Sequence, residues 1–344
     1  MVLIEKFSSP TIKLWLVQRR INKRIFSRSS VVDWPSYIYG SIPNSVDKDG
    51  KETRKDYVSC AGIHCGAKSV LRVDVKDFFN NIHFDVVEKI FSDLFRYPEE
   101  VSDVLARVCI HNNSLPQGGL TSGYLACLCL YDVEPDIVRR LKNKGLKYTR
   151  FVDDITISSE FAGYDFSFAK KLVFDMLHSK DLPVNENKTN IQRLSTEPIM
   201  VHGLRITYKE PRLASDEVRK IRAAVRNIEK VAMHPGYRTT NSYKKDYNRC
   251  MGRVNKLARV KHKQHQNFVA RLSKIKPLPS RAAVKRAKSM VRRLQHDYTH
   301  QVKSYWYKKR YYQAHERLNI IHRSFPNIAS LLRLRLKNIK PEYE

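Results

Sequence analysis

The segment 147–158 reads KYTRFVDDITIS, and its pattern decides the fold. Two short runs of β-forming residues, 147–152 and 155–158, flank the adjacent carboxylates Asp153 and Asp154. This is typical of a β-hairpin with an acidic tip. Adjacent carboxylates repel each other, so placing both in one turn is unfavourable unless a cation binds there. For this pair alone, an acidic turn solvated by water is the more common interpretation.

A third carboxylate lies at the end of another apolar run. Residues 70–75 read VLRVDV and predict a strand in which Asp74 has no evident partner. A sheet that places this strand beside the hairpin would gather Asp74 with Asp153, and carboxylate and phosphate oxygens are the ligands that Mg²⁺ prefers. Two such ions stabilise the attacking and the leaving oxygen in phosphoryl transfer. The sequence therefore predicts a site for two Mg²⁺ ions, with Mn²⁺ as the alternative ion.

The chain is strongly and unevenly basic. It has 344 residues, with 64 Lys and Arg against 34 Asp and Glu, and a net charge of +30. Residues 1–204 hold 28 basic and 25 acidic side chains, whereas residues 205–344 hold 36 and 9. A field of this sign and density indicates a polyanionic partner. Nucleic acid is favoured over an anionic membrane because no amphipathic helix with a clean apolar face is evident.

Composition disfavours several other classes of protein. The apolar fraction of 42% suits a folded core, and no apolar run approaches the ~18 residues of a membrane span. The N-terminus lacks the pattern of a signal peptide, so we expect a cytoplasmic protein. The six cysteines include no C-x-x-C pair. Buried thiols are therefore expected rather than zinc ligands, also at Cys60, His64 and Cys65.

Apolar periodicity and chain breakers predict the α+β class, a mixed body to about residue 210 and then a helical lobe. Helices are expected at 1–28, 84–95, 121–142 and 165–180, and a second hairpin at 200–208. From residue 215 onward one helix follows another.

Five segments, in order along the chain, resemble a known family. They read LRVDVKDFFNNI at 71–82, LPQGGLTSG at 115–123, YTRFVDD at 148–154, NENKT at 185–189 and VHGL at 201–204. In this order they resemble motifs A to E of reverse transcriptases. The two aromatic residues after Asp74 and the arginine before the aspartate pair resemble the bacterial retron and defence-associated enzymes, including the unassigned and abortive-infection groups.

The resemblance implies a right-hand polymerase fold. A palm with an antiparallel sheet and motifs A to E would span 70–210. A reduced fingers region at 1–69 would precede it, and a basic helical thumb with a C-terminal extension at 211–344 would follow. Because the fingers region is short, its basic residues are candidates to replace the usual triphosphate contacts: Arg19, Arg20, Lys23 and Arg24.

The resemblance also implies roles for residues at the matching motif positions. The metal ligands would be Asp74, Asp153, Asp154 and the backbone carbonyl of Val75. The nucleotide-binding residues would be Phe79 as a steric gate against a ribose 2′-hydroxyl, Gln117, Gly118, Lys188 and Arg72. The primer grip would be Val201, His202, Gly203 and Leu204. Two positions depart from the retron pattern, because Cys60 replaces an asparagine and His202 a threonine.

Several of these residues have ordinary alternatives. Phe79 can belong to the core beside Phe78, and Lys188 can be a solvated surface cation. Arg72 and Arg150 can contact phosphate or merely balance the charge of the aspartates.

The basic lobe is expected to hold nucleic acid. Four cations at helical spacing suit a face that tracks phosphates: Arg249, Arg253, Lys256 and Arg259. The segment 305–312 interleaves rings with cations, and its candidates for base stacking and phosphate contact are Tyr305, Trp306 and Arg310. A helix that buries one aromatic side and solvates the other is the alternative.

The expected function is that of an RNA-directed DNA polymerase in the bacterial cytoplasm. It would make short cDNA from a dedicated structured noncoding RNA and deoxynucleoside triphosphates, as part of an anti-phage defence system. An effector or toxin partner and a homo-oligomer are left open. The alternatives are a protein-primed or template-independent DNA polymerase of the abortive-infection type, and a non-catalytic RNA-binding scaffold. The three intact aspartates argue against the scaffold.

Overall fold

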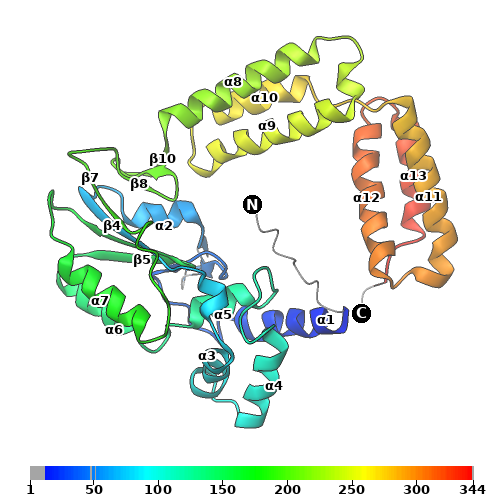
Figure 1. Cartoon of the computed structure of the whole chain (residues 1–344). Coiled ribbons are helices and arrows are strands. Elements are labelled where there is room, and N and C mark those ends of the chain that lie inside the picture. Colours follow the sequence, from blue (N-terminus) through cyan, green and yellow to red (C-terminus); the bar gives the residue numbers. More distant parts are fainter. Residues whose placement is uncertain (1–11, 47–48, 51, 343–344) are drawn as a thin grey trace. The chain divides into compact units, whose positions relative to one another are not determined.

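The computed structural model describes residues 12–46, 49–50 and 52–342. The chain folds into two compact units, Met1–Ala214 and Ser215–Glu344 (Figure 1). The first combines a sheet with helices, and the second consists of helices. Part of the expected helix at 1–28, and the N-terminal residues that predict no signal peptide, lie outside the described residues.

The first unit is built on a five-stranded sheet in the order β1-β5-β6-β4-β7. Its strands are β1 (Ile38–Tyr39), β4 (Ser69–Asp74), β5 (Lys147–Phe151), β6 (Asp154–Ser159) and β7 (Asn190–Arg193). Neighbouring strands are antiparallel except for β1 and β5. The expected hairpin and the expected strand at 70–75 are confirmed, and they lie side by side in the sheet.

The sheet has an apolar and a polar face because successive residues of a strand point to opposite sides. On the apolar face, Leu71, Val73, Ile155 and Ile157 are fully buried. They share a core with side chains of α5, α6 and α7. The register places the polar members of the same strands on the opposite face: Arg72, Asp74, Thr149, Asp154, Thr156 and Ser158. Both strand-borne candidate aspartates therefore lie on the polar face.

Helices surround this sheet in sequence order. They are α1 (Ile12–Ile21), which continues as a π-helical turn (Asn22–Phe26), α2 (Tyr57–Ile63), α3 (Phe84–Lys89) with a second π-helical turn (Ile90–Leu94), α4 (Glu99–Cys109), α5 (Ser122–Leu128), α6 (Glu134–Asn143) and α7 (Ser167–His178). Figure 1 shows α6 and α7 side by side.

The prediction of a single helix at 121–142 is wrong. The structure contains two helices, α5 and α6, separated by turns at 129–133. Pro135 lies in the first turn of α6, where the missing N–H of proline costs no helical hydrogen bond. Proline at this position thus starts a new helix.

Short strands complete the first unit. They are β2 (Ser45–Val46) with β3 (Glu52–Thr53), and a three-stranded sheet of β8 (Met200–Val201), β9 (Leu204–Arg205) and β10 (Arg212–Leu213). The antiparallel pair β8 and β9 confirms the expected hairpin at 200–208.

The second unit is helical over its described residues, as expected. Its α-helices are α8 (Ser215–Ala232), α9 (Asn241–Arg259), α10 (His265–Lys274), α11 (Arg281–Gln301), α12 (Tyr305–Ile321) and α13 (Pro326–Lys337). The last three share one apolar core. Hydroxyl side chains cap the N-termini of α9, α11 and α12, namely Thr240, Ser280 and Ser304. Within the described part of the chain, no helix is both long and apolar enough to span a membrane.

Candidate active site

The register of the sheet brings the three aspartates together. Asp74 and Asp154 are direct partners in the pairing of β4 with β6, and side chains at such positions are neighbours. Asp153 lies in the turn just before β6, and its carbonyl accepts a hydrogen bond from the Val75 N–H at 3.3 Å. The end of the first strand and the hairpin tip thus meet as their sequences predicted.

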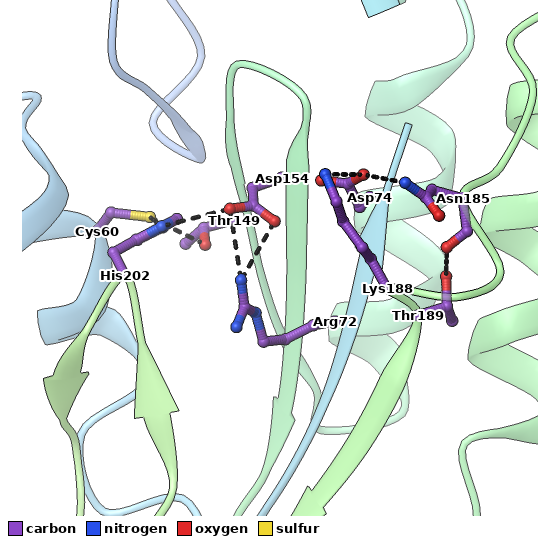
Figure 2. A network of polar contacts seen from close by, with 9 residues as sticks. All are labelled: Cys60, Arg72, Asp74, Thr149, Asp154, Asn185, Lys188, Thr189 and His202. Atoms are coloured by element: carbon purple, nitrogen blue, oxygen red, sulfur yellow. Dashed lines mark hydrogen bonds and ion pairs between the residues drawn. The ribbon is translucent and has the colours of Figure 1, made fainter. Parts of the chain in front are cut away.

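Asp74 is held by two polar side chains from the segment after α7 (Figure 2). Lys188 Nζ lies 3.2 Å from Asp74 Oδ2, and Asn185 Nδ2 donates to the same oxygen at 3.0 Å. The Asn185 N–H also donates to the Asp74 carbonyl at 2.8 Å. Lys188 was predicted near the site. Asn185 was given no role, and only its spatial contact reveals one.

Asp154 has a different pair of neighbours, which Figure 2 also shows. Arg72 Nη2 lies 3.4 and 3.5 Å from its two carboxylate oxygens, and His202 Nδ1 lies 3.7 Å from Oδ2. Arg72 stands two residues before Asp74 on the same strand, so both side chains lie on one face of the sheet. Arg72 here balances the charge of Asp154, which is one of the two alternatives that its sequence left open.

The electrostatics of these carboxylates suit a divalent cation. Burial raises the pKa of Asp153, and the charges of Asp154 and Asp74 raise it further, whereas a bound cation would relieve that repulsion. Carboxylate and carbonyl oxygens are also the appropriate donors for Mg²⁺. Among the described residues, no three His, Cys, Asp or Glu side chains already form a metal-binding group. To share an ion, Asp74 and Asp154 would have to turn away from their cationic neighbours.

The turn that presents the aspartates has a strained backbone. Val152 has a φ of +58°, although β-branched residues rarely adopt positive φ and the corresponding turn usually carries glycine there. Arg150 Nη1 donates to the Val152 carbonyl at 3.1 Å. Strain of this kind persists only where the surroundings enforce the conformation, and this hydrogen bond is part of that enforcement.

Arg150 is the centre of a buried polar cluster. Its side chain is 1% exposed and forms a bidentate pair with Glu134 through Nε at 2.6 Å and Nη2 at 2.8 Å. Its remaining donors reach the carbonyls of Ala126, Cys127 and Val152, so all five N–H groups have acceptors. Burial excludes the suggested phosphate contact for Arg150. Glu134 was not predicted, although alternation along β5 places Arg150 and Tyr148 on the apolar face.

The candidate nucleotide-binding residues lie in two short segments. Phe79 is half-buried in the 3₁₀ segment Phe78–Asn81, and its ring packs edge to face with Phe78 at 5.9 Å between centroids. Gln117 and Gly118 are exposed in the loop before α5, and the φ of +88° at Gly118 favours glycine. Within the described residues, no hydrogen bond or ion pair joins these three to the aspartates.

The expected primer-grip segment forms the β8–β9 hairpin. Val201 and Leu204 are buried and pair with each other across it. His202 and Gly203 form its two-residue turn, with φ values of +48° and +76°. The His202 side chain is 8% exposed and contacts the active-site carboxylate rather than solvent.

The candidate phosphate-contacting cations lie on α9. Arg249, Arg253, Lys256 and Arg259 are exposed. Two of them have acidic neighbours, because Arg249 lies 3.7 Å from Asp246 and Lys256 lies 3.0 Å from Glu217. Exposed pairs of this kind are weak, so these cations keep their ability to meet phosphate.

The aromatic segment of α12 divides between core and surface. Tyr307 and Tyr311 are buried, whereas Tyr305 and Trp306 are 56% and 63% exposed. Lys309 Nζ lies 5.0 Å from the Trp306 ring centroid. Arg310 forms an ion pair with Asp297 at 2.5 Å. The alternative in which one aromatic side is buried thus describes two of the rings, and the other two are exposed to solvent.

The chain resembles known proteins over nearly its whole length. Residues 7–219 match the family described as reverse transcriptase (RNA-dependent DNA polymerase). The Retron Ec48 reverse transcriptase of Escherichia coli is 44% identical over 332 residues, covering 96% of this chain and 81% of that protein. The Retron Se72 reverse transcriptase of Salmonella heidelberg is 31% identical over 330 residues, covering 95% and 83%.

Among solved structures, telomerase from Candida albicans in complex with a TWJ fragment of telomeric RNA is 11% identical, with a TM-score of 0.41. It covers 96% of this chain and 59% of that chain. The family match spans more than half of the chain and contains all five sequence motifs, which confirms the expected polymerase fold class. The chain belongs to the reverse transcriptase family, and the relatives that share this identity with it are retron enzymes.

Proposed function

We propose that this protein is the RNA-directed DNA polymerase of a retron, which copies a dedicated structured noncoding RNA into short cDNA and acts in anti-phage defence. The observation that carries the proposal is the meeting of Asp74, Asp153 and Asp154 at one edge of the sheet, in a chain that belongs to the reverse transcriptases. The cytoplasm, where nucleotides and phage nucleic acid are present, is its proposed location.

Reverse transcription by this family depends on divalent metal ions, and we assign them to the three aspartates and the Val75 carbonyl. When bound there, such ions stabilise charge on the attacking and leaving oxygens of phosphoryl transfer. Lys188, which is 67% exposed beside Asp74, is placed to meet the triphosphate. Arg72 keeps Asp154 in position until nucleotide and ions bind, because it pairs with that carboxylate.

The remaining motif residues receive binding roles. Phe79 stands at the rim of the core beside the sheet and would exclude a ribose 2′-hydroxyl. Gln117 and Gly118 present side chain and backbone in an exposed loop, where they would contact the incoming nucleotide. Val201 and Leu204 anchor the hairpin whose turn would support the primer end.

The second unit would hold the RNA and its cDNA product. Residues 205–344 carry 36 basic and 9 acidic side chains, and such an excess binds the phosphate backbone without sequence preference. The exposed Tyr305 and Trp306 would stack unpaired bases, and each stacked base contributes about 1–3 kcal/mol. The cations of α9 and Arg310 would contact phosphates.

The decisive test is to purify the protein from its bacterial host and sequence the nucleic acid bound to it. We expect a defined RNA together with DNA complementary to part of it. The double variant D153N/D154N should retain the RNA and lose the DNA, whereas the control D175N, at an exposed position on α7, should retain both. Equal amounts of DNA with the double variant would contradict the proposal.

Two further measurements examine the finer parts of the proposal. Treatment with RNase or protease shows whether the DNA is joined to RNA, as expected for a retron, or to protein, as in protein priming. Phage plating on cells with the wild type and with D153N/D154N tests defence, since protection should require the aspartates.

A further inference from the structure

His202 occupies a backbone position that ordinarily suits other residues. It is the first of two turn residues with positive φ, +48° and then +76° at Gly203. This type of hairpin turn prefers Asn, Asp or Gly at both places. A residue held in a sparsely populated conformation at a functional site is often kept for its side chain.

The His202 side chain is directed into the molecule and meets three groups. Its Nδ1 lies 3.7 Å from Asp154 Oδ2, its Nε2 lies 3.3 Å from Cys60 Sγ, and its ring centroid lies 4.8 Å from that of Phe151 (Figure 2). The distance to Asp154 is longer than a hydrogen bond but remains an attractive contact for an N–H that faces a carboxylate.

A chain of polar groups holds the far side of the ring. Cys60 Sγ lies 3.3 Å from Thr149 Oγ1, Thr149 Oγ1 lies 2.8 Å from His64 Nε2, and His64 Nδ1 lies 2.7 Å from Ser158 Oγ. Cys60, Thr149, His64 and Ser158 are all buried. The chain therefore ties the hairpin turn to α2 and to two strands of the central sheet.

The buried thiol can determine which nitrogen of His202 carries the proton. Burial raises the pKa of Cys60 to about 12, so the thiol retains its proton and can donate it in a hydrogen bond to His202 Nε2. Neutral imidazole then carries its own proton on Nδ1, the nitrogen that faces Asp154. An outer partner fixes the orientation of metal-site histidines in the same way.

We propose that His202 is a positioning residue that orients the Asp154 carboxylate for the divalent ion, with Cys60 holding its ring. This differs from the primer-grip role that motif position implies for His202. The inference rests on the proposed function, because it takes Asp154 as a metal ligand. His202 would supply the N–H contact that keeps Asp154 oriented once Arg72 is engaged elsewhere.

The variant that separates this role from folding is H202N. Asparagine suits the positive φ of the turn, so the hairpin should persist, but its shorter side chain cannot span the distance to Asp154. C60S retains a donor beside His202 Nε2, and C60A removes it. H178N, at an exposed position on α7, is the matched control.

The direct readout is Mn²⁺ affinity of the purified protein, measured by electron paramagnetic resonance without substrate, with D153N/D154N defining the background. Loss of an outer partner typically weakens metal binding or activity by 10–100-fold. We therefore expect at least about a 10-fold weaker Mn²⁺ affinity for H202N, a smaller loss for C60A, and wild-type affinity for C60S and H178N.

The second readout is steady-state extension of oligo(dT) on poly(rA). For H202N, kcat should fall while the Kd for the primer–template stays unchanged. Unchanged Mn²⁺ affinity with a raised primer–template Kd would overturn the inference in favour of a grip on the primer. Unchanged values of both would also overturn it. If the wild type extends no primer, the proposed function fails, whereas the Mn²⁺ comparison still decides the role of His202.

Discussion

At the scale of single residues, the two aromatic side chains after Asp74 divide their work. Phe78 is 3% exposed and belongs to the core, whereas Phe79 is half-buried beside it. Because the two rings touch but only one reaches the surface, their truncations should have different consequences. The sequence alone left Phe79 between a core role and a role in substrate selection.

We predict that F79A raises ribonucleotide incorporation relative to deoxyribonucleotide incorporation, because removal of the ring leaves room for a 2′-hydroxyl. One or two orders of magnitude are expected, about the 1–3 kcal/mol that one steric or apolar contact contributes to discrimination. F78A is the control. It should lower stability by about 3–5 kcal/mol, as for other buried phenylalanines, without changing sugar selectivity. Competition between the two nucleotides in primer extension measures the effect, and equal selectivity of wild type and F79A would assign Phe79 to the core.

At the scale of secondary-structure elements, Arg150 joins β5, the C-terminus of α5 and the start of α6 through one side chain. Removal of one partner of a buried ion pair leaves the other charge unpaired, at a cost of about 3–5 kcal/mol. We predict a loss of this size for both R150A and E134A. Urea unfolding followed by fluorescence in a W306F background reports on the first unit, which contains Trp15 and Trp34.

Two further variants complete this prediction. The apolar pair R150M/E134L should recover much of the stability, because well-packed apolar residues can replace a buried pair. It should not recover activity, because the hydrogen bond to the strained Val152 turn is lost. K147A breaks the exposed pair of Lys147 with Glu160 and should have little effect. Equal losses in K147A and R150A would contradict the buried pair as a determinant of stability.

The contact of α2 with the sheet should depend on pH through His64. Burial, with smaller contributions from the charges of His202 and Lys147, lowers the pKa of His64 to about 3. Between pH 6.5 and 3 the unfolded chain therefore binds a proton that the folded chain does not bind. Stability from this residue is unaffected above pH 6.5 and falls as the pH drops below it.

We predict that between pH 7.5 and 5.0 the wild type loses about 2 kcal/mol of unfolding free energy more than H64Q does, at ~1.4 kcal/mol for each unit below 6.5. Glutamine cannot take up this proton, and the titration of His202 is common to both proteins. Urea unfolding at several pH values measures the difference. Parallel pH profiles would show that His64 can take up a proton in the folded state.

The sequence predicted those elements whose signal is local. The acidic hairpin, the strand that ends at Asp74 and the helical second unit all follow from short-range patterns, because alternation and helical periodicity are properties of neighbouring residues. The site residues that were missed depend on contacts between distant segments. Asn185 reaches Asp74 across 111 positions, and Glu134 meets Arg150 from another element. No spacing rule indicates such pairs.

The two departures from the retron pattern illustrate the same limit. Cys60 and His202 are 142 positions apart, yet Cys60 Sγ and His202 Nε2 lie 3.3 Å from each other. Each departure is visible in the sequence by itself. That they form one contact, and that this contact ends at Asp154, becomes evident only when α2 and the β8–β9 hairpin are placed beside the sheet.

At the scale of the whole molecule, charge is divided between the two parts of the chain. Residues 1–204 are nearly balanced, with 28 basic and 25 acidic side chains, and residues 205–344 carry the excess. If α9 tracks phosphates, its cations should release counterions when RNA binds. The number of those contacts is then measurable as the slope of log Kd against log salt concentration.

We predict that R249A/R253A/K256A/R259A lowers this slope by about one unit for each phosphate contact removed, and so by about three to four in total. The control K142A/K144A/K170A/K171A removes the same number of charges from exposed positions of the first unit at α6 and α7. Both variants have the same net charge, so the comparison tests location rather than total charge. Fluorescence anisotropy with a labelled RNA hairpin over a range of KCl concentrations measures the slopes. Equal slopes for the two variants would mean that the field of the whole chain, and not the face of α9, binds the RNA.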